Sequence, residues 1–281
     1  MTTLEMNDVV KSIRDLPALP VIVSELISSL EDEDTGANTL AHKLSKDQAL
    51  SAKTLRLANS SFYGRSSKVS TMQQAIAILG FNSVRTLVTS AAIFSGFSTA
   101  THASFNFEGF WRHSIATALC AKILAHEVGA SQDLAFIAGL MHDIGRLVLL
   151  TAAPQNFEEV IAYRNEKDTY LLEAEIRILG IEHAMVGRAL AAHWKFPATI
   201  QNAIANHHTP NVHDADSLAS VIHFADCIAH ALDLSNDDQD LVFPVSDAVS
   251  QKFNLEQAAL SKIYQQVEAQ FEEASKILLS T

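Results

Sequence analysis

A histidine and an aspartate stand side by side in an otherwise apolar part of this sequence. The stretch GLMHDIGRLVLL, residues 139–150, contains His142 and Asp143. Burying a carboxylate is costly unless it is paired or coordinates a metal, and a neighbouring imidazole can serve in the same arrangement. The pair alone does not decide between these roles, because a His-Asp dipeptide at a helix end is more often a capped terminus or a buried hydrogen bond.

Five more residues of the same two types occur in short motifs on either side of this pair. The motifs WRHS, EHAMVG, ANHHTP and IHFADC supply His113, His183, His207, His208 and Asp226. Imidazole and carboxylate ligands suit divalent transition metals such as iron, manganese, nickel or zinc. Because Asp143 has two carboxylate oxygens, it can bridge two ions. The set predicts a metal site, and the alternative is a polar, hydrogen-bonded core that holds no ion.

Three further polar residues lie where they would support such a site. Arg146 follows His142 by one helical turn, so its guanidinium would either hold a substrate phosphate or pair with a nearby carboxylate. His223 and His230 lie three residues before and four after Asp226. That spacing places them on the same helical face, where each would support the ligands.

The apolar residues recur three and four apart along nearly the whole chain, which predicts an all-α protein. The expected helices cover residues 20–30, 47–58, 71–79, 83–97, 110–125, 182–194, 216–232 and 256–279. No alternating pattern indicates a strand. Gly80, Gly129 and Gly180 are expected to end helices, and Pro154 and Pro197 to lie in first helical turns.

The stretch GFSTATHASFN, residues 96–106, is small, polar and aperiodic, and it predicts a boundary between two helical lobes. The first lobe would cover residues 1–98. The second would cover residues 105–281, carry the metal ligands and end in a C-terminal helix.

Composition restricts the partners and the compartment. The chain has 281 residues, of which 48% are hydrophobic and 19% charged, with a formal net charge of −12. DNA and anionic membranes both require basic patches, so neither is expected as a partner. Two cysteines are too few for a disulfide framework, and the most apolar stretch is interrupted by three ionisable residues. We therefore expect a cytoplasmic protein.

The first lobe contains LPALP at residues 16–20, KDQALSAKTLRLANSSFYG at 46–64 and AIAILG at 75–80. In order and spacing these segments resemble the HDOD family, a helical module common in bacterial signalling proteins and related to the HD metal-dependent phosphohydrolases. The second lobe resembles the HD superfamily: a leading His, the His-Asp pair, two further His elements and a distal Asp. The resemblance implies an HD-type helical bundle.

The resemblance also implies how two ions would be shared. His113, His142, Asp143 and Asp226 would hold one ion, and the second would share Asp143 and use His183 with His207 or His208. In one interpretation the protein is a signalling module whose metal site is structural or regulatory and whose output is contact with a protein partner. In the other it is a phosphohydrolase acting on a phosphomonoester or phosphodiester, such as a phosphorylated small molecule or nucleotide. Asp143 and Arg146 would then carry catalytic roles.

The second lobe is also similar to the HD-GYP phosphodiesterases, but it departs from them at two positions. His207 and His208 run into TPNVHDADS and not into a Gly-Tyr-Pro loop. Gly109 lies four residues before His113, where that class often has a glutamate ligand. We therefore expect no third metal ion and no efficient hydrolysis of cyclic-di-GMP.

The first lobe has no cluster of metal-ligand residues, so its expected role is to dock against the second lobe. Arg56, Asn59, Phe62 and Tyr63 lie near the end of its best-marked helix and are the candidate contacts. The alternative for Phe62 and Tyr63 is that they are core aromatic residues of the first lobe.

Overall fold

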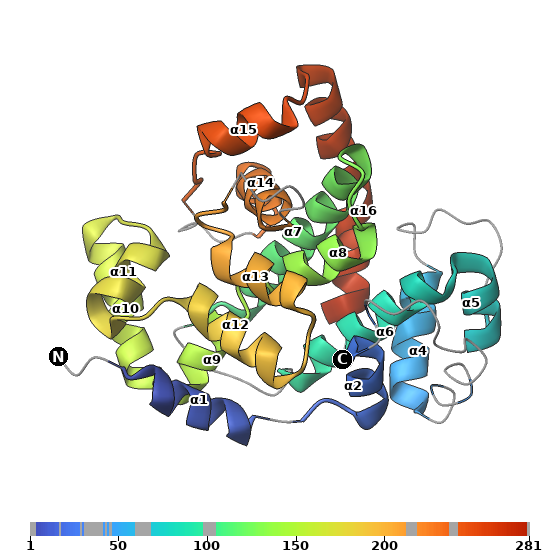
Figure 1. The fold of residues 1–281 in the computed structure, drawn as a ribbon, viewed down its shortest axis with the longest axis horizontal. Coiled ribbons are helices and arrows are strands. Elements are labelled where there is room, and N and C mark those ends of the chain that lie inside the picture. The colour runs from blue at the N-terminus through green and yellow to red at the C-terminus, as the bar shows by residue number, and fades with distance from the viewer. Residues whose placement is uncertain are drawn as a thin grey trace.

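The computed structural model describes residues 4–16, 18–28, 30, 42, 44, 47–59, 69–97, 105–211, 218–235 and 241–279. Every regular element within these residues is a helix (Figure 1), which confirms the all-α prediction. The helices are α1 (Met6–Asp15), α2 (Val21–Ser28), α4 (Gln48–Ala58), α5 (Met72–Leu79), α6 (Phe81–Gly96), α7 (Phe107–Glu127), α8 (Gln132–Met141), α9 (Gly145–Ala152), α10 (Pro154–Lys167), α11 (Leu171–Leu179), α12 (His183–His193), α13 (Ala198–Asn206), α14 (Leu218–Ala231), α15 (Asp247–Phe253) and α16 (Gln257–Leu279).

Most helix ends follow the expected local chemistry. Gly80 and Gly180 end α5 and α11 with φ angles of 85° and 74°, a region that suits glycine. Pro154 lies in the first turn of α10, as predicted. Pro197 is not in the first turn of a helix, as the sequence predicts, but is the residue immediately before α13.

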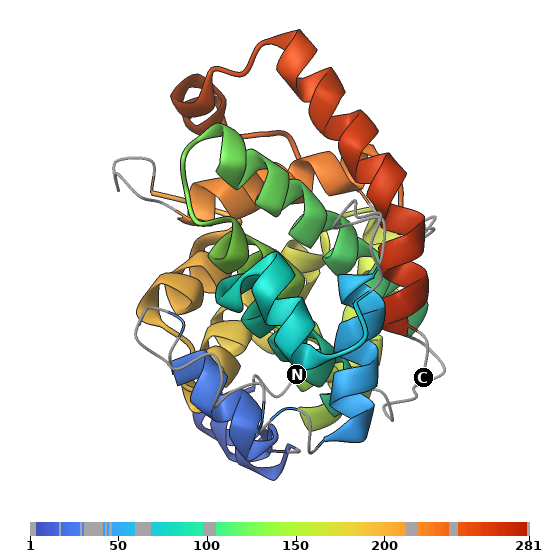
Figure 2. The same cartoon turned by 90° about the vertical axis from the view of Figure 1, so that its right-hand side faces the viewer.

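The second lobe is a bundle around the long helix α7. Helices α8, α14 and α16 pack directly on α7, and α13 packs on both α12 and α14. Figure 2 shows α16 crossing α7 along the side of the bundle. The face of α7 that points into the bundle includes Ile115, Leu119 and Leu124, all at most 1% exposed. The bundle therefore surrounds the helices that carry the candidate ligands.

Helices α8 and α9 and the turn between them form the most apolar stretch of the bundle. By length and composition, Gln132–Ala152 would be able to cross a membrane, but 83% of its apolar window is buried inside the protein. Helices in the core of a protein are often long and apolar enough to pass such a test. The ionisable residues of this stretch are therefore enclosed by the helices that pack around it.

The two lobes are in direct contact. Helix α6 packs on α8, and α16 from the end of the chain packs on α4 and α6. Helix α1 lies beside α9 and α12 (Figure 1), so the beginning of the chain packs against the helices that follow Asp143 and begin with His183. The boundaries 1–98 and 105–281 stay a prediction.

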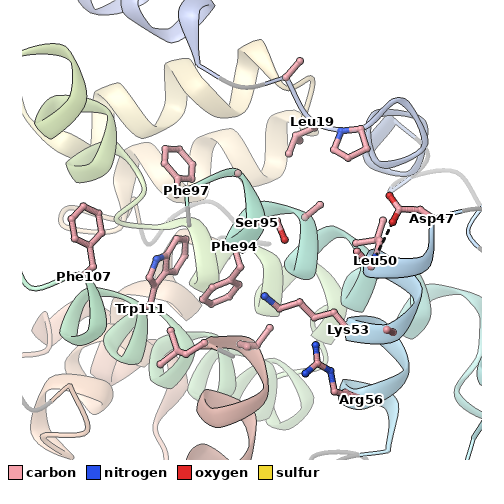
Figure 3. A pocket seen from close by; sticks show the side chains of 18 of the residues that line it. Leu19, Asp47, Leu50, Lys53, Arg56, Phe94, Ser95, Phe97, Phe107 and Trp111 are labelled. Carbon is pink, nitrogen blue, oxygen red and sulfur yellow. Dashed lines mark hydrogen bonds between the residues drawn. The ribbon is translucent and has the colours of Figure 1, made fainter. Parts of the chain in front are cut away.

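A cavity of about 940 Å³ lies at the contact between the lobes (Figure 3). Lys53 and Arg56 reach it from α4, and Phe94 and Trp111 form part of its wall from α6 and α7. Arg56 thus lies where a contact between the lobes was expected.

The other three candidate contacts do not act in this way or lie outside the described residues. Asn59 binds within its own lobe, because its amide donates to the Val69 carbonyl at 2.8 Å and accepts from the Val69 amide at 2.7 Å. Phe62 and Tyr63 are outside the described residues.

Candidate metal centre

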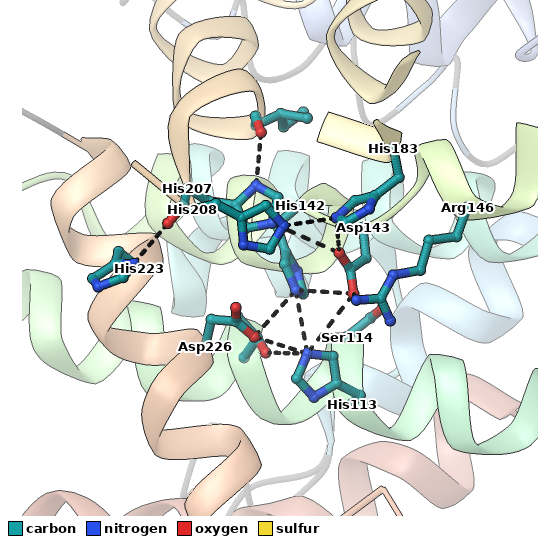
Figure 4. A network of polar contacts seen from close by, with 12 residues as sticks. His113, Ser114, His142, Asp143, Arg146, His183, His207, His208, His223 and Asp226 are labelled. Carbon is teal, nitrogen blue, oxygen red and sulfur yellow. Dashed lines mark hydrogen bonds and ion pairs between the residues drawn. The ribbon is translucent and has the colours of Figure 1, made fainter. Parts of the chain in front are cut away.

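Seven residues that are spread over more than one hundred positions of the sequence lie close together in the second lobe (Figure 4). They come from the first half of α7, the turn between α8 and α9, the first residue of α12, the end of α13 and the middle of α14. They are His113, His142, Asp143, His183, His207, His208 and Asp226. The structure thus brings together all the residues proposed as ligands from the sequence, while their roles stay a prediction.

The cluster lies in the interior of the protein. His142, His183 and His207 are 0% exposed, and Asp143 is 1% exposed. His208 is partly exposed and lies at the edge of the group. A group of this polarity is costly to bury unless its charges are compensated inside the protein.

Four donors form one half of the cluster, which we call half A. The Nε2 atoms of His113 and His142 are 3.2 Å apart, and they lie 2.9 and 3.4 Å from Asp226 Oδ1. The fourth donor, Asp143 Oδ2, is 3.4 Å from His142 Nε2 and 3.9 Å from His113 Nε2. Ligands at about 2.0–2.1 Å from one ion lie about 3.0–3.4 Å apart when adjacent and up to about 4.2 Å apart when opposite, so spacings of 2.9–3.9 Å are compatible with one ion.

The other oxygen of Asp143 belongs to a second group, which we call half B. Asp143 Oδ1 is 3.0 Å from His183 Nε2 and 3.7 Å from His207 Nε2. His208 Nε2 is 2.9 Å from His183 Nε2. The nitrogens of His183, His207 and His208 all lie within 4.8 Å of one another. Asp143 therefore contributes one oxygen to each half.

In three of the imidazole rings, the Nδ1 atom faces away from the centre of the cluster and contacts an acceptor oxygen. His142 Nδ1 lies 2.7 Å from the Gly139 carbonyl, and His207 Nδ1 lies 2.7 Å from the Ile204 carbonyl. A carbonyl oxygen only accepts, so Nδ1 carries a proton in both rings. In the neutral ring, Nε2 then presents its lone pair to the centre of the cluster, which is the form that binds a metal.

Glu175 on α11 performs the same task for His183, and sequence reasoning missed it. Its Oε2 accepts from His183 Nδ1 at 2.6 Å and from the His183 backbone amide at 2.9 Å. Glu175 is 0% exposed. One signal was available: Glu175 shares the apolar face of its helix with Leu171 and Ile178, which marks it as a buried carboxylate.

Several donor atoms at the centre have contacts without hydrogen-bond geometry. Asp143 Oδ1, Asp143 Oδ2, Asp226 Oδ1 and His207 Nε2 are buried and have no hydrogen-bond partner among the described residues. Buried polar atoms normally have one. Lone pairs that converge without hydrogen bonds are the arrangement that a cation satisfies, so the residues present fit a transition metal.

The protonation of the rings reflects the two carboxylates. Burial alone would lower the pKa of His142, but Asp143 and Asp226 outweigh it and raise that pKa to about 10. Burial likewise opposes a charge on His183, and Glu175 and Asp143 raise its pKa to about 9. Burial and the charge on His142 lower the pKa of His207 to about 3. Without a metal ion, protons on two rings therefore compensate the carboxylates.

Arg146 lies at the edge of half A. Its Nη2 atom is 2.9 Å from Asp143 Oδ2. The open alternative from the sequence was a phosphate contact or a carboxylate pair, and the structure shows the carboxylate pair. Although burial opposes the charge of Asp143, Arg146 is the largest of the influences that hold its pKa well below the usual range.

His223 and an aromatic pair surround the cluster. His223 Nδ1 lies 2.8 Å from the His207 carbonyl, and its Nε2 accepts from the Ser246 amide at 3.1 Å, so His223 supports the chain at His207. The ring centroid of Phe243 is 5.8 Å from that of His208 and 4.2 Å from that of Tyr170, on which Phe243 stacks. These aromatic rings lie beside the more exposed side of half B.

Comparison with known proteins gives one family and several similar folds. The HDOD domain family model matches residues 16–210. A candidate phosphohydrolase from Shewanella amazonensis SB2B has a TM-score of 0.78 at 26% sequence identity, over 96% of this chain and 98% of that chain. An HDOD domain protein of unknown function from Geobacter sulfurreducens has the same fold, with a TM-score of 0.78 at 24% identity over 98% of both chains.

Two curated relatives are longer than the part that matches. An uncharacterized protein of Treponema pallidum is 25% identical over 236 residues, which are 83% of this chain and 45% of that protein. A ribonuclease Y of Pediococcus pentosaceus is 36% identical over 96 residues, which are 34% of this chain and 13% of the enzyme. The chain thus spans less than half the length of these relatives.

Proposed function

The chain belongs to the HDOD family, and from this premise we propose that it is a cytoplasmic bacterial signalling module whose second lobe holds two divalent transition metal ions. The observation that carries the metal proposal is the orientation of the rings. His142, His183 and His207 direct Nδ1 to acceptors outside the cluster and Nε2 toward Asp143 or its neighbours. This orientation is the one that metal-binding histidines adopt.

In this proposal each half of the cluster holds one ion. Half A uses His113, His142, Asp143 and Asp226, and half B uses Asp143, His183, His207 and His208. Mixed nitrogen and oxygen donors suit iron, manganese, nickel or zinc. Asp143 belongs to both halves, so occupation of one half changes the charge that the other half experiences.

The enclosure of the cluster favours a structural or regulatory role for the metals. His142, His183 and His207 are fully buried, and Phe243 lies against the ring of His208. A phosphoester would have to displace these groups to reach the donors. An ion held here would instead stabilise the packing of α7, α12, α13, α14 and the turn between α8 and α9, and a partner protein would recognise the resulting surface.

A phosphohydrolase is the second candidate, and the position of Arg146 at the edge of the cluster, beside Asp143, favours it. Two ions bridged by a carboxylate would supply an activated water for phosphoester hydrolysis. Arg146 would hold the phosphate if it left Asp143 Oδ2, which is now 2.9 Å from it. The likeness to the candidate phosphohydrolase of S. amazonensis supports this class of reaction, and the substrate that we propose is a phosphomonoester or phosphodiester. The net charge of −12 opposes a long nucleic acid, despite the partial match to a ribonuclease.

Element analysis of the purified full chain, followed by a phosphoester screen, tests both candidates. The proposal expects close to two equivalents of metal after reconstitution and little or no turnover of generic phosphoesters or cyclic-di-GMP. Efficient turnover of a phosphomonoester or phosphodiester by the loaded protein, absent without metal, would establish the second candidate. Well under one equivalent of iron, manganese, nickel or zinc would overturn both.

A further inference from the structure

Three imidazoles surround one carboxylate oxygen in half A. Asp226 Oδ1 lies 2.9 Å from His113 Nε2, 3.4 Å from His142 Nε2 and 3.3 Å from His230 Nε2. Nevertheless, this buried oxygen has no hydrogen-bond partner among the described residues. The three rings therefore lie beside the oxygen at about the spacing of ligands on one ion, without hydrogen-bond geometry to it.

His230 occupies the same position relative to half A as the expected ligands. It follows Asp226 by one turn of α14, and its side chain is 2% exposed. The centroid of its ring lies 4.2 Å from the centroid of the His113 ring. Donor atoms of His113, Asp226 and His230 all lie within 4.8 Å of one another. Opposite ligands of one ion are about 4.2 Å apart, and Asp226 Oδ1 lies 2.9 Å from His113 Nε2 and 3.3 Å from His230 Nε2, so either ring can share an ion with Asp226.

We propose that His230 is a fifth protein ligand of the ion in half A, in addition to His113, His142, Asp143 and Asp226. This proposal rests on the binuclear centre proposed above. The order of ligands that the sequence resembles ends at Asp226, so His230 lies outside it.

A fifth ligand makes the two halves unequal. Half A would have five protein donors, and half B would have four, from Asp143, His183, His207 and His208. An ion that accepts six ligands would keep one exchangeable position in half A and two in half B. Half A would therefore bind the tighter and less accessible ion, while the ion in half B would exchange.

Cobalt(II) loading of the full chain tests this assignment. Each histidine bound to Co²⁺ gives one strongly shifted, exchangeable N–H proton signal in NMR. At one equivalent of Co²⁺, the wild-type protein is expected to show three such signals, from His113, His142 and His230. His230→Gln keeps an N–H that can reach Asp226 but has no imidazole. It should show two signals and at least about tenfold weaker binding of the first ion, by analogy with the losses seen around other metal sites.

Two further variants complete the test. His230→Glu offers a carboxylate of similar reach, so it should restore tight binding while still showing two signals. It also serves if His230→Gln does not fold. His126→Gln is the control, because His126 is exposed near the end of α7 and lies outside the cluster.

The outcomes separate this inference from the proposed function. If the wild-type protein binds two ions but His230→Gln keeps three signals and wild-type affinity, His230 is no ligand and only this inference fails. If His230→Glu binds the first ion as weakly as His230→Gln despite being folded, the inference also fails. If the wild-type protein takes up no Co²⁺ at all, both the binuclear centre and the fifth ligand are overturned.

Discussion

Glu175 and His183 are joined by two hydrogen bonds to a single carboxylate oxygen. Oε2 of Glu175 accepts from both the ring Nδ1 and the backbone amide of His183, at 2.6 and 2.9 Å. The first residue of α12 is thus fixed in position and in ring orientation by a side chain from α11.

Replacing Glu175 should weaken half B specifically. In Glu175→Gln the acceptor is neutral, so His183 loses the negative charge that raises its basicity, and the affinity of half B should fall about 10- to 100-fold. Chelator competition with the reconstituted protein would measure this loss. Glu173→Gln, an exposed change on the same helix, should leave both affinities unchanged. An equal loss in both variants would show that the effect is general and not due to the contact with His183.

Asp143 should be required for both ions, whereas His208 should be required for only one. Asp143→Asn removes the shared carboxylate, so metal content should fall from about two equivalents to nearly none. His208→Ala should leave half A occupied, with close to one equivalent. At neutral pH the metal-free Asp143→Asn protein should also be less stable by up to about 3–5 kcal/mol, because buried cationic partners lose their counter-charge. Two retained equivalents in Asp143→Asn would exclude a bridging role.

Metal binding should release protons and strengthen as the pH rises. The pKa values of about 10 for His142 and about 9 for His183 mean that both rings are protonated at pH 7 in the metal-free protein. Metal must displace these protons, so affinity should increase about tenfold per pH unit for each proton displaced, until the pH reaches about 9. Calorimetry in buffers with different ionisation enthalpies would count the protons. An affinity that does not change between pH 6 and pH 9 would contradict this protonation state.

The same pKa values predict how stability depends on pH. A raised folded-state pKa stabilises the metal-free protein below the unfolded value of about 6.5, and this contribution is lost as the pH rises toward 9–10. The metal-bound protein does not depend on these protons. The difference in Tm between the two forms should therefore widen from pH 6 to pH 9, as differential scanning calorimetry would show.

Gly145 should be needed for the close approach of α9 and α12. A Cβ atom at this position would collide with the His183 carbonyl and lie 2.7 Å from the Gly187 amide nitrogen, both of which are backbone atoms that cannot rotate away. Gly145→Ala should destabilise the protein by about 1–3 kcal/mol and reduce metal occupancy, because it separates Asp143 from His183. Chemical denaturation and element analysis would measure both effects.

Gly96→Ala is the matched control for that substitution. Nothing lies within 4 Å of a Cβ built on Gly96, and it lies in a helix, where alanine is favoured. Its stability and metal content should equal or exceed those of the wild type. If both variants lose the same stability, the effect does not come from the contact between α9 and α12.

The helical fold and seven of the residues that meet in the candidate site were recognisable from the sequence alone. Helical periodicity is a local signal, and so are the glycines that end α5 and α11 and the proline that begins α10. The ligand candidates were also recognisable locally, because His142 and Asp143 interrupt an apolar run.

The tertiary structure alone decided how the donors are grouped. Asp143 directs one oxygen to His142 and the other to His183, residues that are 41 positions apart in the chain, and no local pattern specifies that division. Glu175 and His230 acquired their places in the cluster in the same way, from the packing of α11 against His183 and of α14 against α7. Such contacts depend on close packing between helices distant in sequence, as at Gly145 against the His183 carbonyl, so they exist only once the chain has folded.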